Sequence, residues 1–140
     1  MRLSIRNQLT GTVTSVSHGE VMATVRSRLS DGQEVTAAIT LEAVKDLGIV
    51  DGTEVQILIK STEVSLATQP VTGISIRNQL RGTITAITTG GAMASVKLAV
   101  DGSELTSAIT TAAVADLALE VGQNILALVK STEISLATTT

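Results

Sequence analysis

Two basic residues of this chain stand among hydroxyl groups in a way that could hold an anion. Arg6 follows Ser4 near the start, and Lys60 ends an apolar run just before Ser61. The same set returns later in the chain as Ser75, Arg77, Lys130 and Ser131. Arginine offers a forked donor, lysine a point charge, and serine a hydroxyl that can donate. The set indicates a site for an anion that only accepts hydrogen bonds. The alternative is a surface ion-pair network, with Arg6 bridging Glu63.

These residues belong to a repeat that fills the chain. Residues 4–9 recur unchanged as 75–80, and 60–68 recur as 130–138 with one change. The offset between the copies falls from 71 to 70, so one residue is lost between 96 and 101. We therefore expect one domain over residues 1–69, a linker over 70–73 that holds the only proline, and a second domain over 74–140.

The hydropathy pattern within each repeat is that of short β-strands. Apolar and polar residues alternate along three runs, and Asp-Gly pairs at 31–32 and 101–102 lie between two runs, which is typical of a hairpin. One short helix interrupts the strands, at 41–47 in the first copy and at 110–117 in the second. The predicted fold class is all-β: two tandem OB-like five-stranded Greek-key barrels, each with one short helix. In such a barrel the first and last strands can bring Arg6 and Lys60 to one rim.

Composition argues against several functions. The chain has no Phe, Tyr, Trp or Cys and a net charge of −3, which is unfavourable for nucleic-acid binding and excludes a disulfide or thiolate site. No apolar run is long enough for a membrane helix, and residues 1–9 lack the apolar core of a signal peptide. The sole histidine, His18, has Thr89 as its counterpart, so a duplicated histidine-dependent active site is not possible. We expect a cytoplasmic binding protein that is not an enzyme and contacts neither nucleic acid nor membrane.

The start of each short helix is a third candidate. If Thr40 and Thr110 cap the helices, backbone N–H groups, including those of Ala43 and Ala113, would point outward as donors. The alternative is an ordinary helix cap. Arg26 and Lys97 alternate with buried positions, so we expect them to face solvent.

At these residues the sequence resembles the Mop, or molybdenum-pterin-binding, domain family. The resemblance rests on Ser-Ile-Arg-Asn-Gln-Leu-x-Gly-Thr at the start of each repeat, Ala-Ile-Thr before the helix, and the segment Leu-Ile-Lys-Ser-Thr-Glu-Val at 58–64. Three ordered motifs found twice cover nearly the whole chain. The tandem arrangement is similar to that of the molbindins, di-Mop proteins of molybdenum homeostasis.

The resemblance implies that molybdate or tungstate is the ligand, with no organic cofactor and no bare metal cation. It also implies a homotrimer of six Mop domains with anions held between domains. The oxyanion-binding residues that it implies are Ser4, Arg6, Asn7, Thr40, Ala43, Lys60 and Ser61, with Ser75, Arg77, Asn78, Thr110, Ala113, Lys130 and Ser131. For Asn7 and Asn78 a structural role is the alternative. A second anion site would lie around His18, Gly19, Val21 and Gly91; the alternative for His18 is a solvated residue of a His18-Gly19 turn.

A donor-only site suits molybdate, because this dianion carries no proton at neutral pH and hydrogen phosphate would leave its proton unpaired. The function expected from the sequence is intracellular oxyanion binding for molybdenum storage and homeostasis. The alternative is an oxyanion-sensing module that regulates a partner transporter or a transcription regulator.

Overall fold

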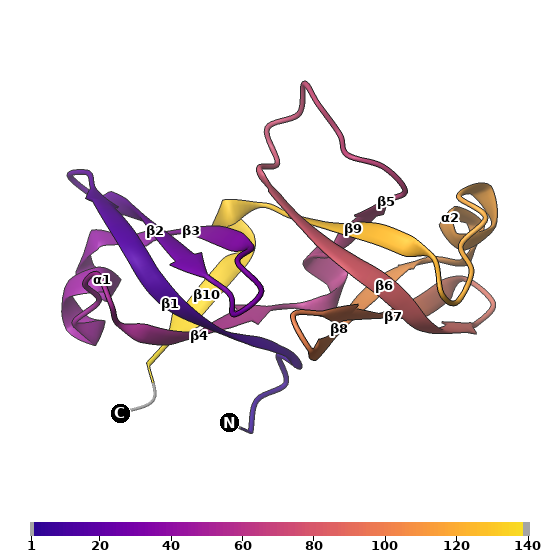
Figure 1. The fold of residues 1–140 in the computed structure, drawn as a ribbon, viewed down its shortest axis with the longest axis horizontal. Coiled ribbons are helices and arrows are strands. Elements are labelled where there is room, and N and C mark those ends of the chain that lie inside the picture. Colours follow the sequence, from indigo (N-terminus) through magenta and orange to yellow (C-terminus); the bar gives the residue numbers. More distant parts are fainter. Residues whose placement is uncertain (1, 139–140) are drawn as a thin grey trace.

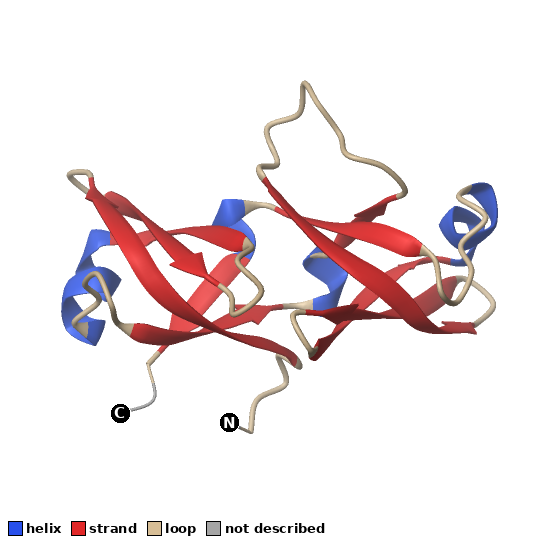
Figure 2. Ribbon diagram, viewed as in Figure 1, coloured by secondary structure: helices blue, strands red, loops and turns tan. Residues whose placement is uncertain are grey.

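The computed structural model describes residues 2–138 and contains two curled β-sheets that lie side by side, with a short helix at each outer end (Figures 1 and 2). The first repeat forms β1 (Asn7–His18), β2 (Met22–Arg28), β3 (Glu34–Thr40), α1 (Leu41–Leu47), β4 (Glu54–Ile59), the 3-10 turn η1 (Ser61–Glu63) and β5 (Ser65–Ala67). The second forms β6 (Asn78–Thr89), β7 (Met93–Val100), β8 (Ser103–Thr110), α2 (Thr111–Asp116), β9 (Asn124–Val129), the 3-10 turn η2 (Ser131–Glu133) and β10 (Ile134–Ala137). The predicted fold class, with one short helix in each repeat, is confirmed.

The two repeats exchange their final strands. One sheet has the order β10-β4-β1-β2-β3 and the other β5-β9-β6-β7-β8. Ile134 of β10 pairs with Ile59 of the first repeat, and Ser65 of β5 pairs with Leu128 of the second. We refer to the two sheets as the first and second barrel, and each of them contains one strand from the other repeat. The repeat pattern does not reveal this exchange.

Aliphatic side chains fill most of the interior of each barrel. Leu9, Val25 and Ile57 in the first barrel and Leu80 and Val96 in the second are at most 1% exposed. β-Branched and leucine side chains pack well on the inner face of a curled sheet, so a core without aromatic rings forms here.

A glycine in β6 permits close packing of β7 against it. A Cβ at Gly82 would lie 2.8 Å from Cγ2 of Val100 and 2.9 Å from the carbonyl oxygen of Ala99. Its counterpart in β1, Gly11, is also tightly enclosed, with Cδ1 of Ile57 at 3.0 Å from the same hypothetical atom. This explains the glycine in the Leu-x-Gly-Thr motif of both repeats.

The residue lost between the repeats belongs to the hairpin after β7. There Val100 pairs with Ser103 and leaves Asp101 and Gly102 as a two-residue turn, both with positive φ (53° and 73°). In the first repeat the ladder stops at Arg28 and Glu34, which leaves a longer connection. The prediction of a hairpin that absorbs the one-residue shift is confirmed.

Both helices begin directly after the predicted capping threonines, although α2 (Thr111–Asp116) is one residue shorter at each end than the predicted 110–117. The hydroxyl of Thr40 accepts a hydrogen bond from the Ala43 N–H (3.1 Å), and Thr110 caps α2 in the same way (3.1 Å). Gly48 ends α1 with φ 64°. At the equivalent position after α2 stands Ala118 with φ 51°, a conformation that is costly for a residue with a Cβ. Within residues 2–138, no helix is both long and apolar enough to cross a membrane.

Candidate functional site

The ladder between β1 and β4 brings Arg6 and Lys60 together. Asn7 pairs with Ile59 in this ladder, so Arg6 and Lys60 occupy the next positions outward on neighbouring strands. The pairing of Asn78 with Val129 does the same for Arg77 and Lys130. The sequence correctly predicts that the two cations share a rim, but the strand responsible is the fourth of the repeat. The last strand, which was expected to do this, lies in the other barrel.

These four cations are exposed and have no acidic partner in the described part of the chain. The ion pairs found there join Arg26 and Arg28 to Glu34, and Lys97 to Glu104. The alternative in which Arg6 bridges Glu63 is therefore not seen among residues 2–138. Arg26 and Lys97 lie on the surface, as predicted. The charge at the two rims is left available for an external anion.

Asn7 and Asn78 stand next to the rim cations and form hydrogen bonds with the opposite repeat. The side chain of Asn7 is 1% exposed; its Nδ2 donates to the Thr106 carbonyl (2.8 Å) and its Oδ1 accepts from the Thr106 N–H (2.8 Å). Asn78 binds the backbone of Thr36 in the same two-bond manner, at 2.8 and 2.9 Å. The amides are thus occupied by backbone groups, which favours the structural alternative for both residues.

The serines of the two 3-10 turns lie between the barrels. Ser61 and Ser131 are half-buried. η1 packs against β8, and η2 packs against β3. The Nδ2 of Asn78 also donates to Oγ of Ser131 at 3.4 Å. Each candidate cluster is therefore built by one repeat and closed by a strand of the other. Ser4 and Ser75 are exposed in the segments that precede the first strands.

The helix N-termini lie far from these clusters in the same chain. α1 and α2 stand at the two outer ends of the molecule, whereas η1 and η2 lie at its centre (Figures 1 and 2). The Ala43 N–H is bound to Thr40, and the Leu41 N–H donates to the Val21 carbonyl at 2.8 Å. Thr110 and Ala113 are arranged alike at the α2 end. One chain therefore does not bring the capping threonines next to the Lys-Ser segments.

The residues predicted to form a second anion site lie beside the starts of the two helices. Met22 pairs with Thr40, and the Gly19 N–H donates to the Met22 carbonyl at 2.8 Å, so the exposed turn after His18 lies beside the start of α1. Gly91 lies in the corresponding exposed turn beside α2, where the Thr111 N–H donates to the Ala92 carbonyl. The sequence predicts His18 within this turn, but His18 is the last residue of β1 and pairs with Ala23, so the turn begins after it.

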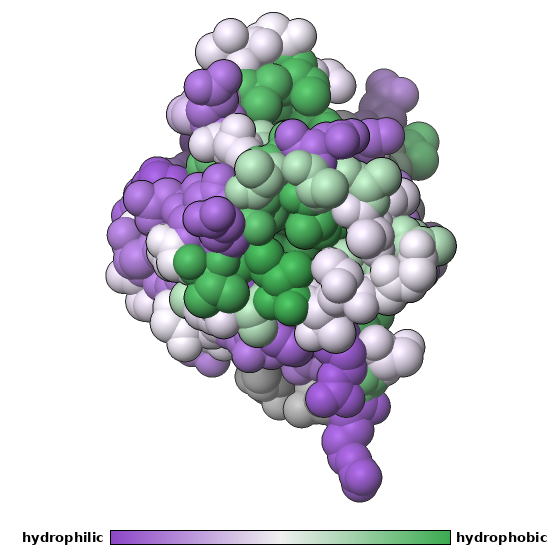
Figure 3. All heavy atoms as spheres, turned by 90° about the vertical axis from the view of Figure 1, so that its right-hand side faces the viewer, coloured by the Kyte–Doolittle hydropathy of each residue, from purple (hydrophilic) through white to green (hydrophobic). Residues whose placement is uncertain are grey.

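Both outer ends expose apolar side chains. Val21 (72%) and Val50 (63%) are exposed at the α1 end, and Met93 (51%) and Val121 (64%) at the α2 end. Figure 3 views the α2 end, where apolar atoms form a continuous area bordered by polar ones. Apolar areas of this kind on a soluble protein are typical of contact surfaces.

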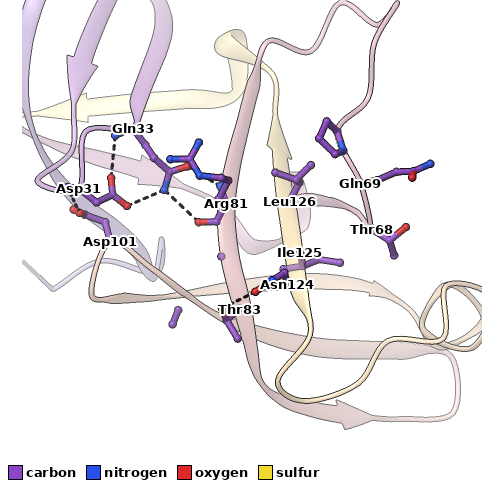
Figure 4. Close-up of a pocket in the computed structure, with 13 residues that line it drawn as sticks. Asp31, Gln33, Thr68, Gln69, Arg81, Thr83, Asp101, Asn124, Ile125 and Leu126 are labelled. Carbon is purple, nitrogen blue, oxygen red and sulfur yellow. Dashed lines mark hydrogen bonds between the residues drawn. The ribbon is translucent and has the colours of Figure 1, made fainter.

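A groove of about 560 Å³ between the barrels contains residues that the sequence does not single out (Figure 4). Gln33 spans the barrels, since its Oε1 accepts from the Arg81 N–H (2.7 Å) and its Nε2 donates to Asp31 (2.8 Å). Hydrogen bonds from the Gln33 side chain, then from its backbone, lower the pKa of Asp31, and the charge of Arg81 adds to this. Asp101 accepts from Ser30 and Asp31 across the same junction. One feature of the sequence could have indicated this junction, namely that its residues differ between the repeats. Ser103 stands at the position equivalent to Gln33, and Thr10 at the position equivalent to Arg81.

Neither this groove nor a second one, of about 610 Å³, is lined by any residue expected to bind the oxyanion. The second groove lies across the same junction and is lined by Thr10, Arg28, Ser30 and Asp101, among others. In the described residues no group of three or more His, Cys, Asp or Glu side chains could hold a metal ion.

Several known proteins are similar to this chain, along its whole length or along one repeat. A solved structure of the cytoplasmic molybdate-binding protein ModG with molybdate bound superposes with a TM-score of 0.93 and 38% identity, covering 99% of both chains. Molybdenum-pterin-binding protein 3 of Clostridium pasteurianum is 44% identical over 66 residues, which are 47% of this chain and 97% of that protein. Molybdenum transport protein ModE of Azotobacter vinelandii is 36% identical over 138 residues, 98% of this chain. The chain spans about half the length of that relative (51%).

A family model described as the TOBE domain matches residues 3–66 and, a second time, residues 74–136. The two matches together account for most of the chain and coincide with the two repeats. The chain therefore belongs to the TOBE domain family and carries two copies of the domain in tandem.

Proposed function

We propose that this chain binds molybdate inside the cell and serves molybdenum storage and homeostasis. The observation that carries the proposal is the similarity along the whole chain to ModG, a protein described as a cytoplasmic molybdate-binding protein. The cations at both rims, which have no acidic partner among residues 2–138, supply the matching chemistry. Tungstate, a tetrahedral dianion of the same kind, belongs to the proposed ligand class. The proposed role is binding, with no catalysis, organic cofactor, nucleic acid or membrane involved.

The proposed binding residues at each rim are donors. In the second repeat Arg77, Lys130 and Ser131 can each donate to an oxyanion, and Ser75 stands two residues before Arg77. A hydrogen bond to a charged group contributes about 1.5–3 kcal/mol. Four or five of them suffice for micromolar binding, about −8 kcal/mol, after the cost of association. Arg6, Lys60 and Ser61 form the equivalent set in the first repeat.

We further propose that the complete sites form in a homotrimer of six domains. The start of α1, with Thr40 and Ala43, lies at the outer end of a chain, whereas Lys60 directly precedes η1, which packs against β8 of the other repeat, so a site that contains all three residues needs two copies. The exposed apolar residues at both ends, such as Val21 and Val121, are suited to contacts between copies. The second anion site, around His18, Gly19, Val21 and Gly91, would then lie where equivalent ends meet.

The alternative function is a sensing module that regulates a partner transporter or a transcription regulator. It is favoured by the match to ModE, of which the chain covers about half. Deleting the gene separates the two functions. Loss of a store lowers cellular molybdenum content under excess molybdate without changing uptake genes, whereas loss of a sensor changes their expression.

Calorimetric titration of the purified chain with molybdate tests the main proposal. We expect heat with molybdate and with tungstate, little competition from phosphate, and sulfate as the stronger competitor because it differs mainly in size. Absence of heat with molybdate would refute the binding function. Light scattering should give a trimer; a monomer that still binds would refute sites between copies.

A further inference from the structure

The side-chain amide of Asn78 touches both the opposite repeat and a serine of the proposed anion site. We propose that Asn78 is a positioning residue, which orients the hydroxyl of Ser131 toward the anion and ties that site to strand β3 of the first repeat. This inference rests on the proposed molybdate-binding function.

The position of the amide is determined by the backbone of β3. Its Oδ1 accepts from the Thr36 N–H at 2.9 Å, and its Nδ2 donates to the Thr36 carbonyl at 2.8 Å. These two bonds define the amide plane, and the residue is only 3% exposed, so the side chain has no alternative rotamer to occupy without losing both. One of the two Nδ2 hydrogens is used by Thr36, and the other is directed at Ser131.

The bond from Asn78 determines what Ser131 can do. Its Oγ accepts from Nδ2 at 3.4 Å, so the hydroxyl hydrogen must point away from the amide. Ser131 directly follows Lys130, and Lys130 lies beside Arg77 at the rim. A hydroxyl held in the donating orientation next to two cations suits a ligand that only accepts hydrogen bonds. Without Asn78, the hydroxyl can rotate freely and lose that preorganisation.

The first repeat provides an internal comparison. Asn7 clamps Thr106 with two bonds of 2.8 Å, which is the same arrangement that Asn78 makes with Thr36. Among the described residues, however, no hydrogen bond joins Asn7 to Ser61. The two sites of one chain therefore differ in the preorganisation of their serine. We expect the site of Lys130 to depend on its asparagine more strongly than the site of Lys60.

A double-mutant cycle on the full-length chain tests the inference by calorimetry with molybdate. Ser131→Ala should weaken binding at one class of site about tenfold, the effect of one hydrogen bond to a charged group. Asn78→Leu, which keeps a branched side chain of four heavy atoms but removes the amide, should weaken the same class. Because Asn78 acts through Ser131, the double variant should lose less affinity than the sum of the losses in the two single variants. Additive losses in the double variant would overturn the inference.

Asn7→Leu with Ser61→Ala is the matched control. Asn7→Leu removes the two equivalent hydrogen bonds to the backbone of Thr106, so we expect a comparable loss of stability. Because no hydrogen bond joins Asn7 to Ser61 among the described residues, the effects of Asn7→Leu and Ser61→Ala on affinity should be additive. Equal coupling in both pairs would overturn the proposed difference between the sites. Wild-type chain that gives no heat with molybdate would refute the underlying function instead, so the two failures are distinguishable.

A measurement on the wild-type chain covers the case in which Asn78→Leu does not fold. The side-chain ¹⁵N–¹H₂ resonances of Asn78 should shift when molybdate is added, and they should also shift in ligand-free Ser131→Ala. Those of Asn7 should move less in both experiments. Unchanged Asn78 resonances under both conditions would contradict a bond between Asn78 and Ser131.

Discussion

Ile134 belongs to the second repeat, but the exchanged strand β10 places its side chain in the first barrel. Ile134 is 3% exposed and stands opposite Ile59, which is fully buried. Residues opposite each other in a ladder share a face, so the two side chains pack together inside the barrel. Its counterpart Val64 is 2% exposed, and its carbonyl accepts a hydrogen bond from Ser107 of β8 at 2.7 Å. Shortening Ile134 should therefore damage the barrel formed mainly by the other repeat.

The magnitude of the effect follows from the atoms removed. Ile134→Ala deletes three carbon atoms, each contributing about 0.8 kcal/mol when buried, which gives about 2.4 kcal/mol. The cavity that remains adds to this, so we expect a loss of about 3 kcal/mol in the free energy of unfolding. For a chain of 140 residues that unfolds as one unit, that corresponds to a fall in Tm of about 10 °C.

Methyl NMR shows which barrel is affected. In Ile134→Ala the δ1 methyl resonances of Ile57 and Ile59 should shift, while those of Ile84 and Ile125 should stay in place. Urea denaturation of the same sample measures the loss of stability. Val64→Ala is the matched control and should produce the reverse pattern, with shifts in the second barrel.

One result would refute this reasoning directly. If Ile134→Ala shifts Ile84 and Ile125 and leaves Ile57 and Ile59 unchanged, then each final strand stays with its own repeat. A loss below about 1 kcal/mol would likewise contradict the burial of Ile134 in a packed core.

Four further changes have defined outcomes. Lys60→Ala combined with Lys130→Ala should remove most of the heat of molybdate binding and leave the circular dichroism spectrum intact, because it deletes one cation at each rim. Ser27→Ala should raise the free energy of unfolding in urea by about 1 kcal/mol, since the buried Ser27 hydroxyl has no partner among the described residues. Ala118→Gly should raise it by about 0.5–1 kcal/mol, because φ is 51° at this position. Asp31→Asn should lower stability slightly near neutral pH, and this difference should shrink as pH falls below about 4: the lowered pKa of Asp31 stabilises the fold at any pH above the ordinary value, and the contribution is lost as pH falls through the folded pKa.

Each of these has a control. Unchanged stoichiometry in the double lysine variant would place the anion elsewhere. Ser107→Ala should destabilise, in contrast to Ser27→Ala, because the Ser107 hydroxyl is satisfied by Val64. Gly48→Ala should cost roughly what Ala118→Gly contributes, since Gly48 has φ 64°. A stability difference for Asp31→Asn that persists unchanged at pH 3 would contradict the ionic origin of the effect.

Local features of this protein could be predicted from its sequence because a few neighbouring residues encode them. The alternating runs indicated the strands, Thr40 and Gly48 marked the ends of α1, and the one-residue shift between repeats fell in a hairpin, where the structure has it. The prediction that Arg6 and Lys60 share one rim was also correct. The first motif begins β1 and the last motif follows the end of β4, and these two strands are neighbours in one barrel.

Long-range features required the tertiary structure. The attachment of Asn7 to Thr106 joins residues 99 positions apart, and no local pattern points to it. The Gln33–Arg81 junction arises from residues that occur in only one repeat. The separation of Thr40 from Lys60 within one chain likewise depends on how the barrels are arranged, with the helices outside and the 3-10 turns at the centre.

The sequence by itself therefore determined the duplication, the all-β class and the candidate donor residues at each rim. Only the tertiary structure decided which barrel each final strand joins. The segments 60–68 and 130–138 differ at one position alone, Val64 against Ile134, so either barrel edge offers nearly the same partner to either strand. Strand pairing depends on backbone hydrogen bonds and on matched side-chain faces, which are almost identical for both choices. The path of the chain through η1 and η2 made that choice, and with it joined the two repeats at each proposed anion site.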